Sequence, residues 1–255
     1  MKKNKQDTSW ESSSAWYDKL VGIEGHYYHK EIIIPGILAI LKQYLDPDPF
    51  LLDLACGQGV LARHLPKQVK YIGIDASPSL IQSAQKNAST NHRFFVHDFT
   101  YALPIPKMLC THACCILALQ NIPSIAPLLQ TAWEHLKKNA PLILVLNHPS
   151  FRIPRQSSWG IDLEKKVQYR RMDCYMTPLQ IPIQTRPSLK NQSEITWSFH
   201  YPLSTYSALL KNAGFVIDLI QEWCSNKKSQ GKMARMENRS REEFPLFMTL
   251  VALKI

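Results

Sequence analysis

Apolar runs and amphipathic segments alternate through the middle of this chain. The apolar runs, each bounded by polar or turn-forming residues, predict strands near 50–55, 69–74, 93–97, 109–117 and 141–147. The segments between them carry apolar residues at helical spacing and predict helices near 58–65, 78–89 and 124–138. Two later apolar runs, at 215–222 and 247–255, predict a closing antiparallel pair. This alternation predicts an α/β fold in which a parallel sheet is covered by helices on both faces.

The pattern changes on both sides of this core. We predict a disordered tail at residues 1–8. We predict an N-terminal cap of two helices at residues 9–46, which ends at a proline-rich break. The main domain is expected at 47–255. Within it, the proline-rich stretch at about 148–200 alternates partly like antiparallel strands, so we expect an insertion after the fifth strand that covers the ligand site. The long basic connection at 225–243 is expected to be mobile.

The first strand leads into a loop suited to binding a nucleoside. This strand is apolar apart from Asp53, as expected for burial on both faces of a parallel sheet. Gly57 and Gly59 follow, and glycine lets a ligand approach the main chain closely. The second strand ends at Asp75, whose carboxylate could accept both hydroxyl hydrogens of a ribose. Because ligands of such folds bind outside the carboxyl ends of the strands, these residues predict one site.

The glycine spacing alone does not identify the cofactor. Gly57, Gly59 and Ala62 also fit the dinucleotide pattern. Two features argue against NAD: the carboxylate of Asp53 lies just before the loop, and about fifty residues precede a strand that often begins a dinucleotide domain. A glycine turn in an unrelated α/β protein is a third interpretation.

Several motifs in order resemble those of class I S-adenosylmethionine-dependent methyltransferases. The run Asp53-Leu54-Ala55-Cys56-Gly57-Gln58-Gly59 resembles their first motif, Ile74-Asp75-Ala76-Ser77 the second, and His97-Asp98-Phe99 the third. Trp16-Tyr17-Asp18 is similar to the helix that precedes the core in many small-molecule members. The resemblance extends to the C-terminus and implies a Rossmann-like three-layer sandwich around a mostly parallel seven-stranded sheet, with an N-terminal helical cap and an antiparallel insertion after the fifth strand.

The resemblance also implies a cofactor site built from strand ends and the N-terminal helix. The expected cofactor-binding residues are Tyr17, Asp53, Ala55, Cys56, Gly57, Gly59, Asp75, Ala76, Ser77, Asp98, Phe99 and Leu117. In this family Asp75 would hold the ribose and Asp98 would meet the adenine amino group. Phe99 could stack on the adenine ring. The implied cofactor is S-adenosylmethionine, released as S-adenosylhomocysteine, and no metal is expected.

The implied reaction is an in-line displacement, in which catalysis is largely alignment and exclusion of water. A general base is needed only when the nucleophile is protonated. Three histidines are candidates for that base: His29 in the cap, His148 directly after the fifth strand, and His200 at the end of the insertion.

Four other residues are candidate substrate contacts. His26 and Tyr28 lie in a cap segment rich in polar aromatic groups, which could close over the positive sulfonium. A half-buried helix face is the alternative for that segment. Arg152 and Arg155 follow the fifth strand and could bind a carboxylate or phosphate through bidentate contacts, or could be exposed residues of a packed loop.

Composition sets further limits. The net charge of +10 is concentrated at 150–190 and 226–243, which suits an anionic substrate or RNA but also an ordinary solvated surface. No run approaches the ~20 apolar residues of a membrane span, and the N-terminus lacks the apolar core of a signal peptide. The six cysteines show no metal-site spacing, which favours reduced thiols in the cytoplasm.

The leading hypothesis is a cytoplasmic methyltransferase that acts on an O or C nucleophile of a small organic substrate. An N nucleophile and an anionic substrate are further options. The cap and the insertion favour it because together they could enclose such a ligand. An RNA methyltransferase is the alternative, but nucleic acid is not favoured because no RNA-binding module is recognisable. A non-catalytic cofactor-binding protein and an NAD-dependent oxidoreductase are further alternatives. The methyl acceptor and the oligomeric state stay open.

Overall fold

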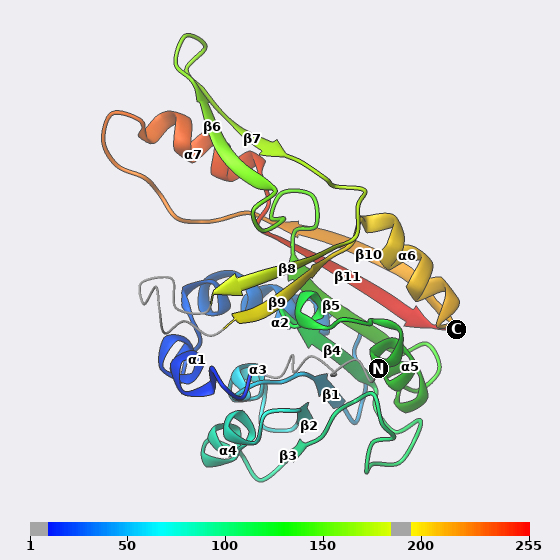
Figure 1. Ribbon diagram of the computed structural model, residues 1–255. Coiled ribbons are helices and arrows are strands. Elements are labelled where there is room, and N and C mark those ends of the chain that lie inside the picture. Colours follow the sequence, from blue (N-terminus) through cyan, green and yellow to red (C-terminus); the bar gives the residue numbers. More distant parts are fainter. Residues whose placement is uncertain (1–9, 185–194) are drawn as a thin grey trace.

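The computed structural model describes residues 10–184 and 195–255, which Figure 1 shows as a ribbon. The tail predicted at 1–8 and residues 185–194 of the predicted insertion lie outside the described residues.

Within the described residues, seven strands form one central sheet. They are β1 (Phe50–Leu54), β2 (Lys70–Asp75), β3 (His92–Val96), β4 (His112–Ile116), β5 (Pro141–Asn147), β10 (Phe215–Trp223) and β11 (Phe247–Lys254). Their order is β10-β11-β5-β4-β1-β2-β3. The first five strands of the chain pair in parallel, whereas β11 runs antiparallel to both of its neighbours. The predicted mostly parallel seven-stranded sheet with a closing antiparallel pair is confirmed.

Helices cover both faces of this sheet, which makes the three layers visible in Figure 1. The flanking helices are α2 (Ile34–Leu41), α3 (Val60–His64), α4 (Pro78–Lys86), α5 (Ala126–His135) and α6 (Leu203–Asn212). Successive residues of a strand point to opposite faces, so Leu51 packs in one apolar cluster with α2, α3 and α4. Leu52 and Leu54 pack in the other cluster, with α5 and α6. These two buried clusters hold the sheet between its helical layers.

The N-terminal segment folds onto the sheet rather than away from it. Helix α1 (Ser14–Val21) contacts α4, and the π-helix η1 (His29–Ile33) continues directly into α2. At Gly36 of α2, an added Cβ would lie 2.5 Å from the Trp223 ring of β10. This close approach requires glycine and fixes the cap against the C-terminal part of the sheet.

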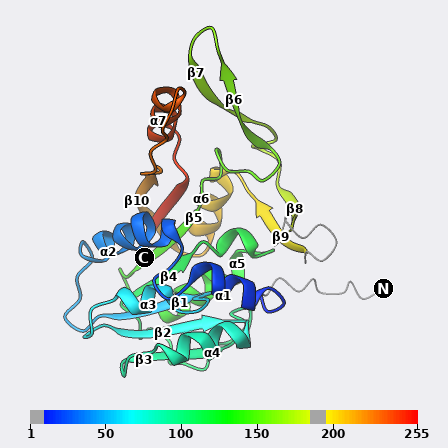
Figure 2. The ribbon, with the colours of Figure 1, turned by 90° about the vertical axis from the view of Figure 1, so that its left-hand side faces the viewer.

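The described part of the insertion contains two separate hairpins. One is β6 (Ser157–Asp162) with β7 (Val167–Met172), and the other is β8 (Leu179–Gln184) with β9 (Ile195–His200). Strand β9 packs against the short helix η2 (Leu119–Asn121) that follows β4. The β6–β7 hairpin instead projects away from the sheet, as the two views in Figures 1 and 2 show. The antiparallel insertion predicted after the fifth strand is confirmed, and it consists of one hairpin near the strand ends and one that extends outward.

The basic connection after β10 also differs from the prediction. It contains helix α7 (Ala234–Glu243), which packs against β7. The hydroxyl of Ser240 donates to the Gln168 carbonyl oxygen at 3.0 Å and is itself buried. The predicted mobile connection is thus a helix docked on the projecting hairpin, because that hairpin supplies a surface that no local pattern reveals.

No helix in the described parts of the chain has both the length and the apolar content to cross a membrane.

Candidate functional site

The loop after β1 has a backbone shape that few side chains allow. Ala55, Gly57 and Gly59 have positive φ angles of 64°, 54° and 74°. At Gly59 an added Cβ would also lie 2.9 Å from the Phe94 ring, so glycine is required there both for conformation and for space. For Ala55 the left-handed conformation costs on the order of 1 kcal/mol, and such strain clusters at ligand sites. The loop therefore holds an unusual backbone conformation at the carboxyl edge of the sheet, where ligands of this fold class bind.

Asp75, at the end of β2, is joined to this loop by backbone hydrogen bonds. Its Oδ2 accepts from the Gly57 amide at 2.8 Å and its Oδ1 from the Ser77 amide at 2.9 Å. Burial raises the pKa of this carboxyl, and the amide donors oppose that shift. The acid predicted to hold a ribose thus lies directly beside the glycine loop.

Helix α1 brings Tyr17 over the same loop. The Tyr17 ring lies 3.7 Å from the position of a Cβ built on Gly57. Burial raises the pKa of Tyr17 to about 12, and the charge of Asp75 adds to the shift. Trp10 packs edge-on against Tyr17, with ring centroids 5.4 Å apart. The N-terminal helix therefore closes one side of the site with an aromatic wall.

Glu11 secures this helix and was missed by the sequence analysis. Its carboxylate accepts from the Ser79 hydroxyl at 2.6 Å, from the Ser79 amide at 3.1 Å and from the Ser77 hydroxyl. These bonds lower the pKa of the Glu11 carboxyl. Glu11 lies three residues before the start of α1 and belongs to no recognisable motif. Its role could not be predicted, because its partners are far away along the chain.

Asp53 lies beneath the loop rather than on its open side. Its side chain is 2% exposed, and Oδ2 accepts a hydrogen bond from the Tyr71 hydroxyl at 2.7 Å. Burial raises the pKa of Asp53 to about 7. The adjoining Cys56 thiol is directed toward Gly73 of β2, where an added Cβ would lie 2.7 Å from Sγ. In this arrangement Asp53 and Cys56 support the loop from behind through their side chains.

The remaining predicted cofactor residues lie along the same edge. Asp98 and Phe99 follow β3; the Asp98 carboxylate accepts from the Thr100 amide at 2.9 Å, and Phe99 packs partly against the core. Leu117 follows β4 with a positive φ of 53°. Ala76 is exposed, whereas Ser77 is buried and caps α4. The sheet topology therefore gathers the ends of β1, β2, β3 and β4 into one arc.

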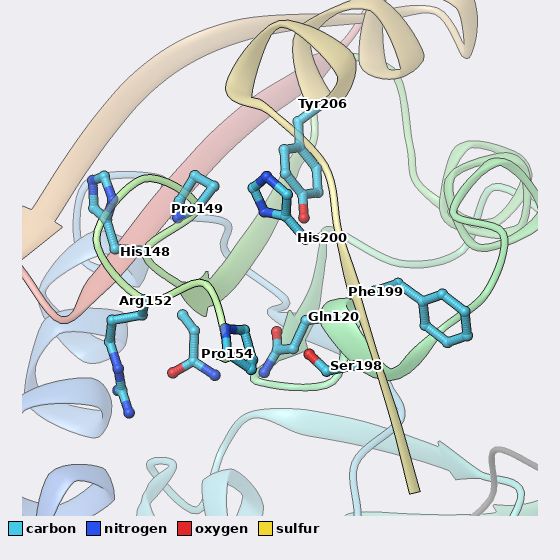
Figure 3. Close-up of a pocket in the computed structure, with 10 residues that line it drawn as sticks. Gln120, His148, Pro149, Arg152, Pro154, Ser198, Phe199, His200 and Tyr206 are labelled. Atoms are coloured by element: carbon cyan, nitrogen blue, oxygen red, sulfur yellow. The ribbon is translucent and has the colours of Figure 1, made fainter. Parts of the chain in front are cut away.

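A small cavity continues this arc at the carboxyl ends of β4 and β5 (Figure 3). Its volume is about 30 Å³, enough for a water or a methyl-sized group. The lining residues come from η2, the end of β5 and its following loop, β9 and α6: Gln120, Asn147, His148, Pro149, Arg152, Pro154, Ser198, Phe199, His200 and Tyr206. The Oε1 atom of Gln120 is buried without a hydrogen-bond partner among the described residues. This oxygen can therefore accept a hydrogen bond from a donor group of a ligand in the cavity.

Of the three candidate bases, His148 has both ring nitrogens engaged. Its Nδ1 accepts from the Ser150 amide at 3.1 Å and the Phe151 amide at 3.3 Å. Its Nε2 lies 2.6 Å from the Glu222 carboxylate, to which it donates. Burial lowers the pKa of His148 despite the opposing effect of Glu222. This geometry orders the loop after β5 and engages both ring nitrogens, and the role of His148 as a base stays a prediction.

The other two candidate bases differ in position. His29 lies on η1 next to Gly25 and Val60, and it does not line the cavity. Burial lowers the pKa of His29 to about 4. His200 lines the cavity, and its Nε2 donates to the Tyr175 carbonyl oxygen at 2.7 Å, which leaves Nδ1 as the acceptor nitrogen. Of these two histidines, only His200 lines the small cavity, and the roles of both as bases stay predictions.

The four predicted substrate residues lie in different places. Arg152 lines the cavity, whereas Arg155 is exposed and does not line it, so only Arg152 is placed at this space. Tyr28 packs against Phe247 with centroids 5.7 Å apart, and its ring is 5.9 Å from that of His26. The aromatic cap segment thus lies beside the start of β11. Tyr206 and Ser198 line the cavity without having been predicted, because nothing local distinguishes them from other residues of a helix and a strand.

Comparisons with known proteins agree with this geometry. Residues 51–139 match the model of a family described as a methyltransferase domain. Over 66 residues the chain is 39% identical to the ribosomal protein L11 methyltransferase of Burkholderia lata, a match that covers 25% of this chain and 21% of that protein. The chain therefore spans about a fifth of the length of the curated relatives it matches.

Solved structures extend the similarity in fold to nearly the whole chain. A S-adenosylmethionine-dependent methyltransferase from Mesorhizobium loti is 22% identical, with a TM-score of 0.66 over 87% of this chain and 100% of that one. Another from Clostridium acetobutylicum is 16% identical, with a TM-score of 0.59 over 96% of this chain and 98% of that one. The matched domain and the shared fold agree with the interpretation that the glycine loop binds S-adenosylmethionine rather than a dinucleotide.

Proposed function

We propose that this class I S-adenosylmethionine-dependent methyltransferase transfers a methyl group to an O or C nucleophile of a small organic substrate. The observation that carries the proposal is the position of the small cavity. It lies at the ends of β4 and β5, on the same edge of the sheet as the glycine loop, and residues of β9 and α6 line it. A space this narrow suits a small reacting group better than an extended macromolecular surface.

The residues around the loop fit the cofactor. A carboxylate offers about four acceptor positions, and backbone amides use only part of those on Asp75, so ribose hydroxyls could bind the rest. Above Gly57 only the Tyr17 ring comes within 4 Å of an added Cβ, which leaves the main chain accessible from that side. Tyr17 would present a π face to a cationic sulfur.

S-adenosylmethionine would supply an already activated methyl group. The chain's own contribution is then to orient the acceptor and exclude water from it. The buried cavity walls, Phe199 and Tyr206, serve the second purpose, and the free Oε1 of Gln120 serves the first by accepting a hydrogen bond.

His200 is the proposed general base for a protonated nucleophile. The bond to the Tyr175 carbonyl fixes the Nε2–H tautomer and leaves Nδ1 to accept a proton. Burial lowers the pKa of His200 from its ordinary value of 6.5, partly offset by that carbonyl. The ring is therefore neutral, and competent as a base, at pH 7. Figure 3 shows it beside Tyr206 at the cavity.

For His200→Gln we expect kcat for a hydroxyl acceptor to fall by about 100- to 10,000-fold, the usual contribution of a general base. Glutamine can still donate to the Tyr175 carbonyl, so affinity for S-adenosylhomocysteine should stay unchanged. In the unaltered enzyme the rate should fall as pH drops through the lowered pKa of His200 and level off above it. An unaltered pH profile in the variant would exclude His200 as the base.

The proposed function is tested by calorimetric titration with S-adenosylhomocysteine, followed by transfer of a labelled methyl group to a panel of small hydroxy and carbon acids. Saturable binding and transfer to a small acceptor are expected. Absence of cofactor binding would favour a non-catalytic protein and contradict the proposal.

RNA methylation is the second candidate, because the structure joins the two basic segments. Helix α7 docks on β7, so basic residues of both segments share one projecting lobe. Aromatic and apolar side chains are exposed on the same hairpin, with Tyr169 49% and Leu163 73% exposed. Base stacking on such side chains beside positive charge is typical of nucleic-acid binding. Methyl transfer to RNA, with affinity that falls steeply as salt rises, would favour this candidate.

A further inference from the structure

A second and larger cavity lies between the loop after β5, the β6–β7 hairpin and the segment that leads into β11. Its volume is about 210 Å³. Arg152, Trp159, Arg170 and Phe244 are among its lining residues. Arg152 also lines the small cavity, so the two spaces share one wall.

Two guanidinium groups face this cavity without a carboxylate. Arg170 donates from Nε to the Phe151 carbonyl at 2.8 Å and from Nη2 to the Ser157 hydroxyl at 2.8 Å. Neither Arg152 nor Arg170 forms an ion pair with an acidic residue in the described parts of the chain. Burial lowers the pKa of both, and the charge of Arg170 adds to the effect on Arg152. Partly buried charges of like sign call for an anion, since unpaired burial is costly.

Three aromatic rings, together with Pro245 and Leu246, form the rest of the wall. The Phe244 ring lies 5.4 Å from Trp159 and 5.4 Å from Phe151, both in edge-on geometry. The Arg170 guanidinium lies 5.0 Å from the centroid of Trp159, and that of Arg152 lies 5.6 Å from the centroid of Phe247. Stacking of this kind holds each guanidinium in one plane while leaving edges for bidentate contacts. The cavity therefore combines planar cation donors with apolar surface.

We propose that this cavity binds the anionic end, a carboxylate or phosphate, of a methyl acceptor whose body is aromatic or apolar. The inference rests on the proposed function, because Arg152 links this cavity to the one at the strand ends. A space of about 210 Å³ is smaller than the roughly 300–1,000 Å³ of a whole ligand pocket. It thus suits one end of the acceptor, while the reacting end would extend toward His200.

The test is calorimetric binding of benzoate and phenyl phosphate to the full chain saturated with S-adenosylhomocysteine. We expect at least one anion to bind, and neutral benzamide to bind far more weakly. Arg170→Gln and Arg152→Gln should each weaken anion binding by about 10- to 100-fold, the loss expected for charge-assisted hydrogen bonds. The preferred anion identifies the acceptor group as a carboxylate or a phosphate.

Arg171→Gln is the matched control. Arg171 is the neighbour of Arg170 on β7, but its side chain pairs with Asp173 at 2.7 Å and is 67% exposed. The Arg171→Gln protein should bind the anions as tightly as the unaltered protein does. Thermal unfolding of each variant shows whether the fold is intact when anion binding is lost. Arg152→Gln is a second variant that keeps the hydrogen bonds of Arg170 to Phe151 and Ser157.

The possible results separate the inference from the proposed function. Equal binding of anions and benzamide, equal binding by Arg170→Gln, or no anion binding while S-adenosylhomocysteine binds would overturn the inference alone. Anion binding without S-adenosylhomocysteine binding would contradict the proposed function and with it the acceptor role of the cavity. Displacement of benzoate by a short RNA, but by no small hydroxy acid, would overturn the inference in favour of an RNA partner.

Discussion

Replacement of Asp75 by alanine is expected to weaken the binding of S-adenosylhomocysteine by about 10- to 100-fold. The carboxylate is the proposed acceptor for the ribose hydroxyls, and charge-assisted hydrogen bonds contribute about 1.5–3 kcal/mol. The same carboxylate accepts from the Gly57 and Ser77 amides, so its loss also loosens the glycine loop. Both effects act in the same direction. Calorimetric titration of the purified variant measures the change.

The control for this experiment is Asp48→Ala. The Asp48 side chain is 69% exposed, pairs with Lys70 and lies before β1, at the opposite end of that strand from the loop. Its replacement should leave cofactor affinity unchanged. A folded Asp75→Ala protein that binds S-adenosylhomocysteine as tightly as the unaltered chain would show that Asp75 does not hold the ribose.

Replacement of Asp53 by asparagine is expected to stabilise the fold at alkaline pH. Folding raises the pKa of this carboxyl from 3.8 to about 7, mainly through burial. The folded state thus holds a proton that the unfolded state releases, and stability falls as pH rises from about 3.8 to about 7. Asparagine has no charge to bury and can still accept from Tyr71. The stability of the variant relative to the unaltered chain should therefore rise by roughly 2–4 kcal/mol between pH 4 and pH 8.

Urea unfolding at pH 4, 6 and 8 measures this difference. Asp48→Asn, which removes an exposed carboxylate, is the control and should not show the same rise. A constant difference between Asp53→Asn and the unaltered chain across this range would mean that Asp53 stays ionised in the folded protein. If Asp53 supports the loop only from behind, the variant should also bind S-adenosylhomocysteine with nearly unchanged affinity.

The chain's local patterns were sufficient to predict the sheet and the cofactor edge. Strands buried on both faces leave continuous apolar runs, and the residue after such a run must lie at a strand end. That reasoning located Gly57, Asp75 and Asp98 correctly at one edge, because parallel strands share their carboxyl ends. Glycine at position 59 permits the positive φ that the loop adopts, but the sign of φ is decided by the loop, since Gly36 and Gly73 do not adopt it.

Contacts between remote residues were decided only by the tertiary structure. His148 precedes its partner Glu222 by 74 residues, and this pairing engages the Nε2 atom of the ring. The docking of α7 on β7, which replaces the expected mobile connection, depends on a surface formed by a separate hairpin. The cavity that joins Arg152 to Arg170 likewise needs the insertion to fold back beside β11. Periodicity and residue type report on neighbours along the chain, whereas these features come from packing between distant segments, which determines burial, charge pairing and the space left for a ligand.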